Sequence, residues 1–148
     1  MRITLYVLCE SVAERLRDQG FRCRTVQLTL RDNELFSFQR QKKLEEPACT
    51  SQELFDAAFA LYRANDTGKP YRSVGVRACG LLYEEHTQLS LYPDRMQRQK
   101  QEQLERTVDG LRRRFGHFAL QRGVMLTDRE LSALDPKADH VIYPEGFL

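Results

Sequence analysis

Residues 22–43, RCRTVQLTLRDNELFSFQRQKK, constrain the fold more than any other stretch of the chain. From Val26 to Leu30 apolar residues alternate with polar ones, which is the period of a β-strand with one apolar and one polar face. Asp32-Asn33 has turn chemistry, and a return strand is predicted from Leu35 to Lys43. The sequence therefore predicts an antiparallel hairpin around which the other elements are arranged.

The polar face of this hairpin is basic. Residues 22–43 include six Lys or Arg and two Asp or Glu, a local charge of +4. The face mixes Thr, Gln, Ser and Arg, none of which is a strong general acid or base. Such a face suits contact with a phosphate backbone, with Thr25 and Gln27 as candidate contacts on the first strand. It is also the usual appearance of the solvated side of an antiparallel sheet, so an α+β protein-interaction or regulatory module without DNA binding stays open.

The whole chain is close to neutral, but its charge is unevenly distributed. Its 148 residues include 23 Lys or Arg and 21 Asp or Glu, a net charge of +2, and 41% are hydrophobic. This length and composition predict one domain with a sizeable core. Residues 95–122 carry eight basic and three acidic residues, a local +5, and residues 123–148 carry two and five, a local −3. Such asymmetry predicts a surface with a preferred partner.

The residues that usually carry catalysis or metal binding do not form a recognisable motif. Cys9, Cys23, Cys49 and Cys79 contain no CxxC pair, and with the three histidines they make no zinc spacing. We expect reduced thiols, no metal and no cofactor. No nucleophile–base pair or phosphate-binding loop stands out, so the chain on its own is not expected to be an enzyme. It has no signal peptide and no apolar run of membrane length, which predicts a cytoplasmic location and no membrane partner.

A helix is predicted before the hairpin, over residues 4–19. Apolar residues recur at steps of three and four from Leu5 to Leu16, and Gly20 suits the C′ position that ends a helix. Residues 1–6 also fit an extended segment, because Ile3 and Leu5 alternate with polar neighbours. We place the helix start near Leu5 and leave the extended alternative open.

A second helix and a third strand are predicted after the hairpin. Glu46-Pro47 is a breaker, and Thr50 to Glu53 has the pattern of a capping box at a helix start. This helix should stop between Asn65 and Gly68. The strand that follows, Tyr71 to Ala78, alternates Val74, Val76 and Ala78 with polar or glycine positions. Gly75 within it fits either a close phosphate approach or a bulge.

A long helix from Arg95 to Phe115 is predicted near the C-terminus, with Leu104, Val108, Leu111 and Phe115 as its buried stripe. Its first two turns, RMQRQKQEQ, are expected in solvent. The run Arg112–Arg114 is expected to be a solvated helix end that favours the macrodipole. Residues 123–148 look loop-rich, with a short strand at Val141 to Tyr143.

The order of these elements, completed by a strand before the first helix, is β-α-β-β-α-β. The segments VAERLRDQGFRCRTVQLTLR, FSFQRQKKL and KPYRSVGVRACGL occur in this order and resemble the little finger domain of Y-family translesion DNA polymerases. The long helix ending LRRRFG and the segment QLSLY resemble the C-terminal part of the bacterial members. The likeness covers about residues 5–125. It implies an α+β fold in which an antiparallel β-sheet is backed by two helices and its open face grips DNA phosphates along the major groove.

The resemblance also implies what this chain lacks. Y-family polymerases hold their catalytic carboxylates and two Mg²⁺ ions in a palm, which is not in this sequence, so the chain is expected to bind DNA without polymerising it. The first strand, central in the family's sheet, is truncated. Either residues 1–6 supply a remnant or another segment or chain fills the gap, and an unpaired edge suggests a homodimer. The expected boundaries are 1–82 for the little finger, 83–94 for a linker, 95–122 for the C-terminal helix and cap, and 123–148 for the tail.

Carried over residue by residue, the resemblance implies DNA contacts in the return strand and the third strand. These residue types form no base-reading cluster, so binding to duplex or primer–template DNA should be independent of sequence. The DNA hypothesis needs Arg40, Lys42 and Arg72 together on the face away from the helices. Strict alternation instead places Arg40 and Lys42 on the side of Phe36 and Phe38, which look like core residues. A bulge near Gln39, or a strand end beyond the helices' cover, would resolve this. The implied contacts are Gln39, Arg40, Gln41, Lys42, Arg72, Ser73 and Arg77.

The segment QLSLY at residues 88–92 resembles the pentapeptide by which bacterial polymerases bind the sliding clamp. A short extended peptide gains affinity by seating a few anchors in a preformed groove. The resemblance implies that Gln88 forms hydrogen bonds at the groove edge and that Leu89, Leu91 and Tyr92 supply the apolar part of the motif. Without this role the segment would be a loop packed on its own domain.

Overall fold

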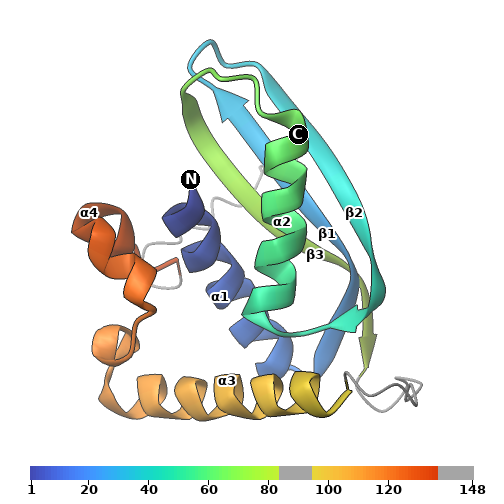
Figure 1. The fold of residues 1–148 in the computed structure, drawn as a ribbon, viewed down its shortest axis with the longest axis vertical. Coiled ribbons are helices and arrows are strands. Elements are labelled where there is room, and N and C mark those ends of the chain that lie inside the picture. The colour runs from blue at the N-terminus through green and yellow to red at the C-terminus, as the bar shows by residue number, and fades with distance from the viewer. Residues whose placement is uncertain (84–94, 137–148) are drawn as a thin grey trace, which may run out of the picture.

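The computed structural model describes residues 1–83 and 95–136, and Figure 1 shows their arrangement. Three strands form one antiparallel sheet in the order β2-β1-β3. Helices α1 and α2 cover the same face of this sheet, and α3 crosses below them (Figure 1). The predicted α+β fold with two backing helices and a long C-terminal helix is therefore confirmed. The elements are α1 Arg2–Asp18, β1 Phe21–Asp32, β2 Ser37–Ala48, α2 Ser51–Asn65, β3 Tyr71–Tyr83, α3 Arg95–Phe115, the 3₁₀ turns η2 His117–Ala119 and η3 Gly123–Thr127, and α4 Arg129–Ser132.

Helix α1 begins earlier than its sequence predicts. Leu5 N donates to Met1 O at 3.0 Å, so residues 2–6 are helical with Met1 as the N-cap, and the extended alternative is wrong. Ile3, Leu5 and Val7 are all buried in the core, and this tertiary burial outweighs the alternating local pattern. The predicted C-terminal end is confirmed. Gly20 has a φ of 68°, and its N–H donates to Arg17 O at 3.2 Å.

The hairpin turn is organised by Asp32. Its Oδ1 accepts hydrogen bonds from the N–H groups of Glu34 and Phe36, both at 2.9 Å, which satisfies the turn backbone. The return strand starts at Ser37, two residues later than predicted. Phe36 therefore belongs to the turn and is 65% exposed, so its expected core position is wrong, whereas Phe38 packs against the core.

The predicted breaker at Glu46-Pro47 does not end the strand. β2 continues to Ala48, which pairs with Cys23, while Thr25 pairs with Lys43. Residues 44–47 therefore lie against a single residue of β1 as an irregularity. The ladder tolerates Pro47 there because β2 is an edge strand, where a missing N–H donor need not break a pairing.

The second helix and the third strand agree with their sequence signals. Thr50 Oγ1 accepts from Glu53 N at 3.4 Å and donates to Glu53 Oε2 at 2.6 Å, so the predicted cap is confirmed. α2 ends at Asn65, inside the predicted window. β3 has the predicted start at Tyr71 but runs five residues further than predicted, to Tyr83.

The core lies between the sheet and the two helices. Val26, Leu28 and Leu30 of β1 are at most 1% exposed, which confirms the apolar face predicted from alternation. They pack under buried residues of both helices, among them Leu5 and Leu54. Because β1 is the central strand, its apolar face receives cover from both helices.

The strand order corrects one expectation drawn from the resemblance. β1 pairs directly with β2 on one side and with β3 on the other, so the sheet has no vacant central position. A strand before α1, as the resemblance implies, would therefore not take a central position in this sheet. Among the described residues no strand precedes α1, and a further strand can join only at the outer edge of β2 or β3.

Helix α3 has the predicted bounds, but its orientation is not the predicted one. Leu104, Leu111 and Phe115 are 57%, 39% and 64% exposed, and Val108 is half-buried, so the expected buried stripe is wrong. The side turned toward α1 and α2 instead carries Glu105 and Asp109, which are buried. Below, "the α3 apolar stripe" means Leu104, Val108, Leu111 and Phe115.

Arg17 of α1 is the counterion that allows this docking. Its Nε donates to Asp109 Oδ2 at 2.7 Å, its Nη1 to Glu105 Oε2 at 2.5 Å, and the same Nη1 to Cys49 O at 2.8 Å. Burial lowers the pKa of the guanidinium, but the hydrogen bond to Asp109 and the charges of both carboxylates outweigh burial and raise this pKa above its usual value. Glu105 also accepts from the N–H and the hydroxyl of Ser51, at 2.8 and 2.7 Å, and so caps α2.

Further ion pairs attach α3 along its length. Its first two turns were expected to stand in solvent, but Arg98 and Glu102 connect them to the rest of the protein. Arg98 bonds Glu53 at 2.7 Å and also pairs with Glu46. Arg22 of β1 donates to Glu102 at 2.7 Å. Burial would raise the pKa of the Glu102 carboxyl, but the hydrogen bonds from Arg22 and Arg106 outweigh it and hold this pKa below its usual range.

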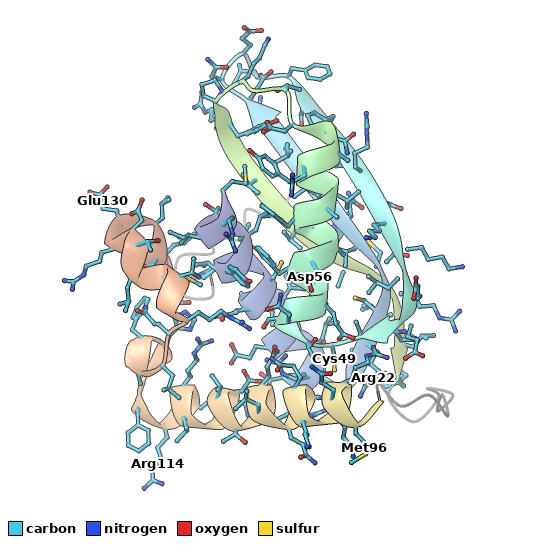
Figure 2. The ribbon with its side chains drawn as sticks, in the orientation of Figure 1. Arg22, Cys49, Asp56, Met96, Arg114 and Glu130 are labelled. Carbon is cyan, nitrogen blue, oxygen red and sulfur yellow. The ribbon has the colours of Figure 1, made fainter. Side chains whose placement is uncertain are left out.

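The basic end of α3 is also paired, which corrects its expected role as a solvated helix end. Arg112 donates to Glu10 at 3.0 Å and to Leu120 O at 2.7 Å, and Arg113 pairs with Asp18. Only Arg114 of the three extends away from the body, as Figure 2 shows.

The segment after α3 turns back toward α1. Met125 of η3 is buried in the core, and α4 is capped by Asp128, whose Oδ1 accepts from Leu131 N at 3.1 Å. The predicted strand at residues 141–143 lies outside the described residues. The domain boundaries stay a prediction. No helix among the described residues combines the length and the apolar character needed to cross a membrane.

Removing the charge of Arg17 should destabilise the protein far more than removing a surface arginine. Arg17→Met leaves Asp109 buried without this counterion and Glu105 with only Arg122 at 3.6 Å, which should lower the free energy of unfolding by about 3–5 kcal/mol. The matched control is Arg113→Met. Arg113 also forms an ion pair between α3 and α1, with Asp18, but its side chain is 57% exposed, so its replacement should cost at most about 1 kcal/mol. Urea unfolding followed by circular dichroism measures both, and equal costs would contradict the role given to Arg17.

Candidate nucleic-acid interface

The sheet face away from α1 and α2, called here the open face, is built by strand alternation. On β1, the positions between the buried Val26, Leu28 and Leu30 point to this side. Register then places two cross-strand neighbours beside each of them; for Gln27, these are Gln41 and Arg77. The open face consists of Thr25, Gln27, Thr29 and Arg31 on β1, Ser37, Gln39, Gln41 and Lys43 on β2, and Ser73, Gly75, Arg77 and Cys79 on β3.

Gln27 organises the centre of the open face. Its Nε2 donates to Gln39 Oε1 at 2.7 Å, and its own Oε1 accepts from Gln41 Nε2 at 3.0 Å. Cys79 Sγ also lies 3.8 Å from Gln27 Oε1. Gln27 is consequently only 5% exposed although it faces away from the core. It holds the two neighbouring glutamines in place, and these, not Gln27, are exposed to a ligand.

The open face is cationic, and no Asp or Glu lies among its residues. Arg31, Lys43 and Arg77 supply one positive charge from each strand, and each of the three is exposed. Amide and hydroxyl groups fill the space between them. Gly75 has no side chain, so its backbone is accessible on the open face. A Cβ atom at this position would lie 3.7 Å from Thr29 Cβ. Cations, amides and exposed backbone are the groups that contact phosphates.

Register separates two of the predicted contacts from this cluster. Arg40 pairs with Leu28 and Lys42 with Val26, so both side chains point to the helix side of the edge strand β2. Arg40 Nε donates to Asn65 Oδ1 at 3.1 Å at the end of α2. The expectation that Arg40, Lys42 and Arg72 lie together away from the helices is wrong for Arg40 and Lys42.

The geometry of the β2 edge explains this placement. No register shift occurs between residues 37 and 43, so the bulge considered near Gln39 is absent. Both basic residues are nevertheless exposed, because β2 is an edge strand of the sheet. They form a second basic strip along the sheet edge.

Arg72 occupies a bulge of its own. Arg31 pairs with Ser73 and Asp32 with Tyr71, which leaves Arg72 as the extra residue of β3. Bulges re-aim a side chain relative to strict alternation. Arg72 is exposed at the end of β3 where Ser73 and Arg31 of the open face also lie.

Six of the contacts expected from the sequence lie on the open face, which also contains residues outside that set, and their role in DNA binding stays a prediction. The six are Thr25, Gln27, Gln39, Gln41, Ser73 and Arg77. Thr29 and Arg31 follow Thr25 and Gln27 at the same two-residue period, so alternation alone could have added them. Lys43 needed the register with Thr25, which the sequence does not contain.

The cysteines differ in their chemistry. Burial raises the pKa of the Cys9 and Cys49 thiols to about 12 and that of Cys23 to about 11, so these three stay protonated. Cys79 is the one cysteine that is not buried, and it lies on the open face beside Thr25. In the part of the chain that the structure describes, no group of three or more His, Cys, Asp or Glu could hold a metal ion.

The expected clamp-binding residues Gln88, Leu89, Leu91 and Tyr92 lie outside the described residues. Their role stays a prediction.

Comparison with known proteins adds an independent finding. Residues 1–91 match the sequence model of the impB/mucB/samB family C-terminal domain. DNA polymerase IV of Acetivibrio thermocellus is 38% identical over 136 residues, which cover 90% of this chain and 34% of that protein. DNA polymerase IV 2 of Bacillus subtilis is 32% identical over 130 residues, 86% of this chain and 31% of that protein. DNA polymerase IV of Pelotomaculum thermopropionicum is 30% identical over 128 residues. The chain spans about a third of the length of these relatives.

Proposed function

Because the chain belongs to the impB/mucB/samB C-terminal domain family, the C-terminal domain of Y-family DNA polymerases, we propose that its open face binds the DNA backbone independently of sequence. The observation that carries this proposal is the cationic, acid-free open face with Arg31, Lys43 and Arg77 on three adjacent strands. These groups contact phosphates without reading bases. The domain would position a polymerase on DNA during repair synthesis past lesions.

Catalysis is not assigned to this domain. The resemblance to Y-family polymerases implies that nucleotidyl transfer takes place in a separate palm, which holds the catalytic carboxylates and two Mg²⁺ ions. The role proposed for this chain is to hold the duplex or primer–template while that chemistry proceeds. The basic strip of Arg40 and Lys42 would extend the contact over the edge of β2 as the backbone leaves the open face.

Weak, salt-dependent binding to duplex DNA is the first expected outcome. If the three open-face cations and Arg72 each neutralise one phosphate, log K should fall with log salt at a slope of roughly −3 to −4. Lys43→Ala/Arg77→Ala should reduce that slope by about 2 and weaken binding equally on any sequence. Fluorescence anisotropy of a labelled 20-base-pair duplex, titrated at several salt concentrations, measures both.

The matched control removes the same charge from the helix side. Arg15→Ala/Arg63→Ala changes two exposed cations of α1 and α2 and should leave the slope unchanged. Cys79 gives a second readout, since bound DNA should slow its alkylation while the three buried thiols stay unreactive. An equal loss in the control, or a strong preference for one DNA sequence, would contradict the proposal.

We also propose that residues 88–92 tether the domain to the bacterial sliding clamp. The support is the QLSLY pattern and its place directly after the DNA-binding domain. Leu91→Ala/Tyr92→Ala should cost roughly 2–4 kcal/mol of clamp affinity, as expected for the anchors of a short docked peptide. Calorimetric titration with purified bacterial sliding clamp measures this. Leu126→Ala/Leu131→Ala, which removes two exposed apolar residues elsewhere, is the control and should bind like wild type. Unchanged clamp binding by the Leu91/Tyr92 variant would refute the tether.

A homodimer through the sheet edge is a third proposal. The outer edge of β3 runs over 13 residues without proline, and Leu81 on it is 48% exposed. Arg72 and Arg77 are the charged residues of this strand, and the unpaired backbone N–H and C=O groups of a long edge can pair with another strand. Sedimentation equilibrium should show a dimer that Leu81→Lys weakens, while Leu35→Lys, at an equally exposed turn residue, leaves it intact. A monomer at 100-fold dilution and at high concentration alike would exclude the pairing.

A further inference from the structure

All three acidic residues of α3 are used in contacts near or within the body of the protein. Glu105 and Asp109 bind Arg17, and Glu102 binds Arg22 of β1. The outward side of the helix therefore presents only cations and uncharged residues. Figure 2 shows Met96 and Arg114 extending away from α1 and α2 at opposite ends of this side. Docking by carboxylates thus leaves α3 with a basic outer surface.

An apolar arc runs along this basic surface. The α3 apolar stripe follows steps of four, three and four residues, so its members lie on one side of the helix. Lys100, one turn before Leu104, and Arg114, one turn after Leu111, flank the stripe on its outward side, and both are exposed. Over residues 104–115 the stripe extends for about 16 Å, or three helical turns.

A pocket of about 240 Å³ adjoins the stripe on its inward side. Leu104 and Val108 form part of its wall, and Leu120 closes it from the segment after α3. Three charged groups that also line the pocket are engaged with one another, since Glu10 binds Arg112 at 3.0 Å and Arg122 at 2.6 Å. The pocket can therefore accept an apolar side chain without leaving any of these three charges unpaired.

We propose that the α3 apolar stripe and this pocket form a docking surface for an acidic amphipathic helix of another protein. Charge complementarity selects this occupant. A helix with apolar anchors spaced over two to three turns covers Leu104, Leu111 and Phe115, and carboxylates beside its anchors face Lys100 and Arg114. One anchor enters the pocket between Leu104 and Leu120.

Two other occupants fit the same surface less well. A DNA backbone would neutralise Lys100 and Arg114 but leave the exposed leucines and Phe115 in water. A second copy of this chain, paired through the same surface, would bring the same cations against each other, and like charges across an interface oppose association. The proposal is independent of DNA binding, because the open face lies on the opposite side of the sheet from the helices.

The test uses a fluorescein-labelled synthetic 18-residue helical peptide with leucines at positions i, i+4, i+7 and i+11 and glutamates at most others. Fluorescence anisotropy with the full chain should show saturable binding to this peptide and much weaker binding to a scrambled peptide of the same composition. Leu104→Gln/Leu111→Gln should weaken binding at least about tenfold, because both residues are central anchors. Circular dichroism should show an unchanged fold, since both side chains are exposed.

Two further variants separate apolar from electrostatic contributions. Leu126→Gln/Leu131→Gln removes two exposed leucines away from α3 and should change affinity less than twofold. Lys100→Glu/Arg114→Glu should weaken binding and remove its salt dependence.

Four results would overturn the proposal. The first is that the designed peptide shows no saturable binding, and the second is that the scrambled peptide binds equally well. The third is that duplex DNA displaces the peptide and that the Leu104/Leu111 variant loses DNA binding to the same extent. The fourth is that the wild type self-associates and that this variant abolishes the self-association. The third would assign the surface to nucleic acid and the fourth to a second copy of the chain.

Discussion

The arrangement of the helices depends on one buried cation. Arg17 is 6% exposed and binds two carboxylates of α3 and the carbonyl of Cys49, at the junction of α1, α2 and α3. Burying such groups is unfavourable unless every charge is paired and hydrogen-bonded, so the three charged side chains are interdependent. Ser51 extends the same network by donating its N–H and hydroxyl to Glu105, which joins the α2 N-terminus to α3. The C-terminal helix is thus attached by ionic contacts, whereas the sheet and its two helices are held by apolar packing.

This division between apolar and ionic contacts gives the molecule distinct surfaces. The apolar residues of β1 are covered by α1 and α2, which leaves the opposite side of the sheet free of any helix in the described structure. The open face can then carry amides and cations, and Gln27 fixes their spacing through hydrogen bonds across two strands. The carboxylates of α3 are turned inward, so its outer surface is basic and partly apolar. In each case the side of the strand or helix that contacts the rest of the protein decides which residues remain on its exposed side.

Much of the fold was predictable because its signals are local. The two-residue period of β1, the turn at Asp32, the Thr50 cap and the Gly20 helix end each depend on a few neighbouring residues, and the structure confirms them. The candidate site was predictable in part for the same reason, since alternation on β1 and β3 places Thr25, Gln27, Ser73 and Arg77 on the polar side. The error at Arg40 and Lys42 has a physical cause. An edge strand can carry charged residues on the same side as core residues, because solvent reaches that side beyond the last helix.

The sequence by itself determined the elements, the two faces of the central strand and the family of the chain, because these depend on short-range pattern. Only the tertiary structure decided that residues 2–6 are helical, that the sheet has no central gap and that α3 docks through Glu105 and Asp109. A leucine stripe normally predicts a buried helix face, since apolar burial is the commonest driving force. In α3 a buried arginine contributed by α1 outweighs that pattern, and no local sequence signal shows that Arg17, 88 residues before Glu105, lies beside it.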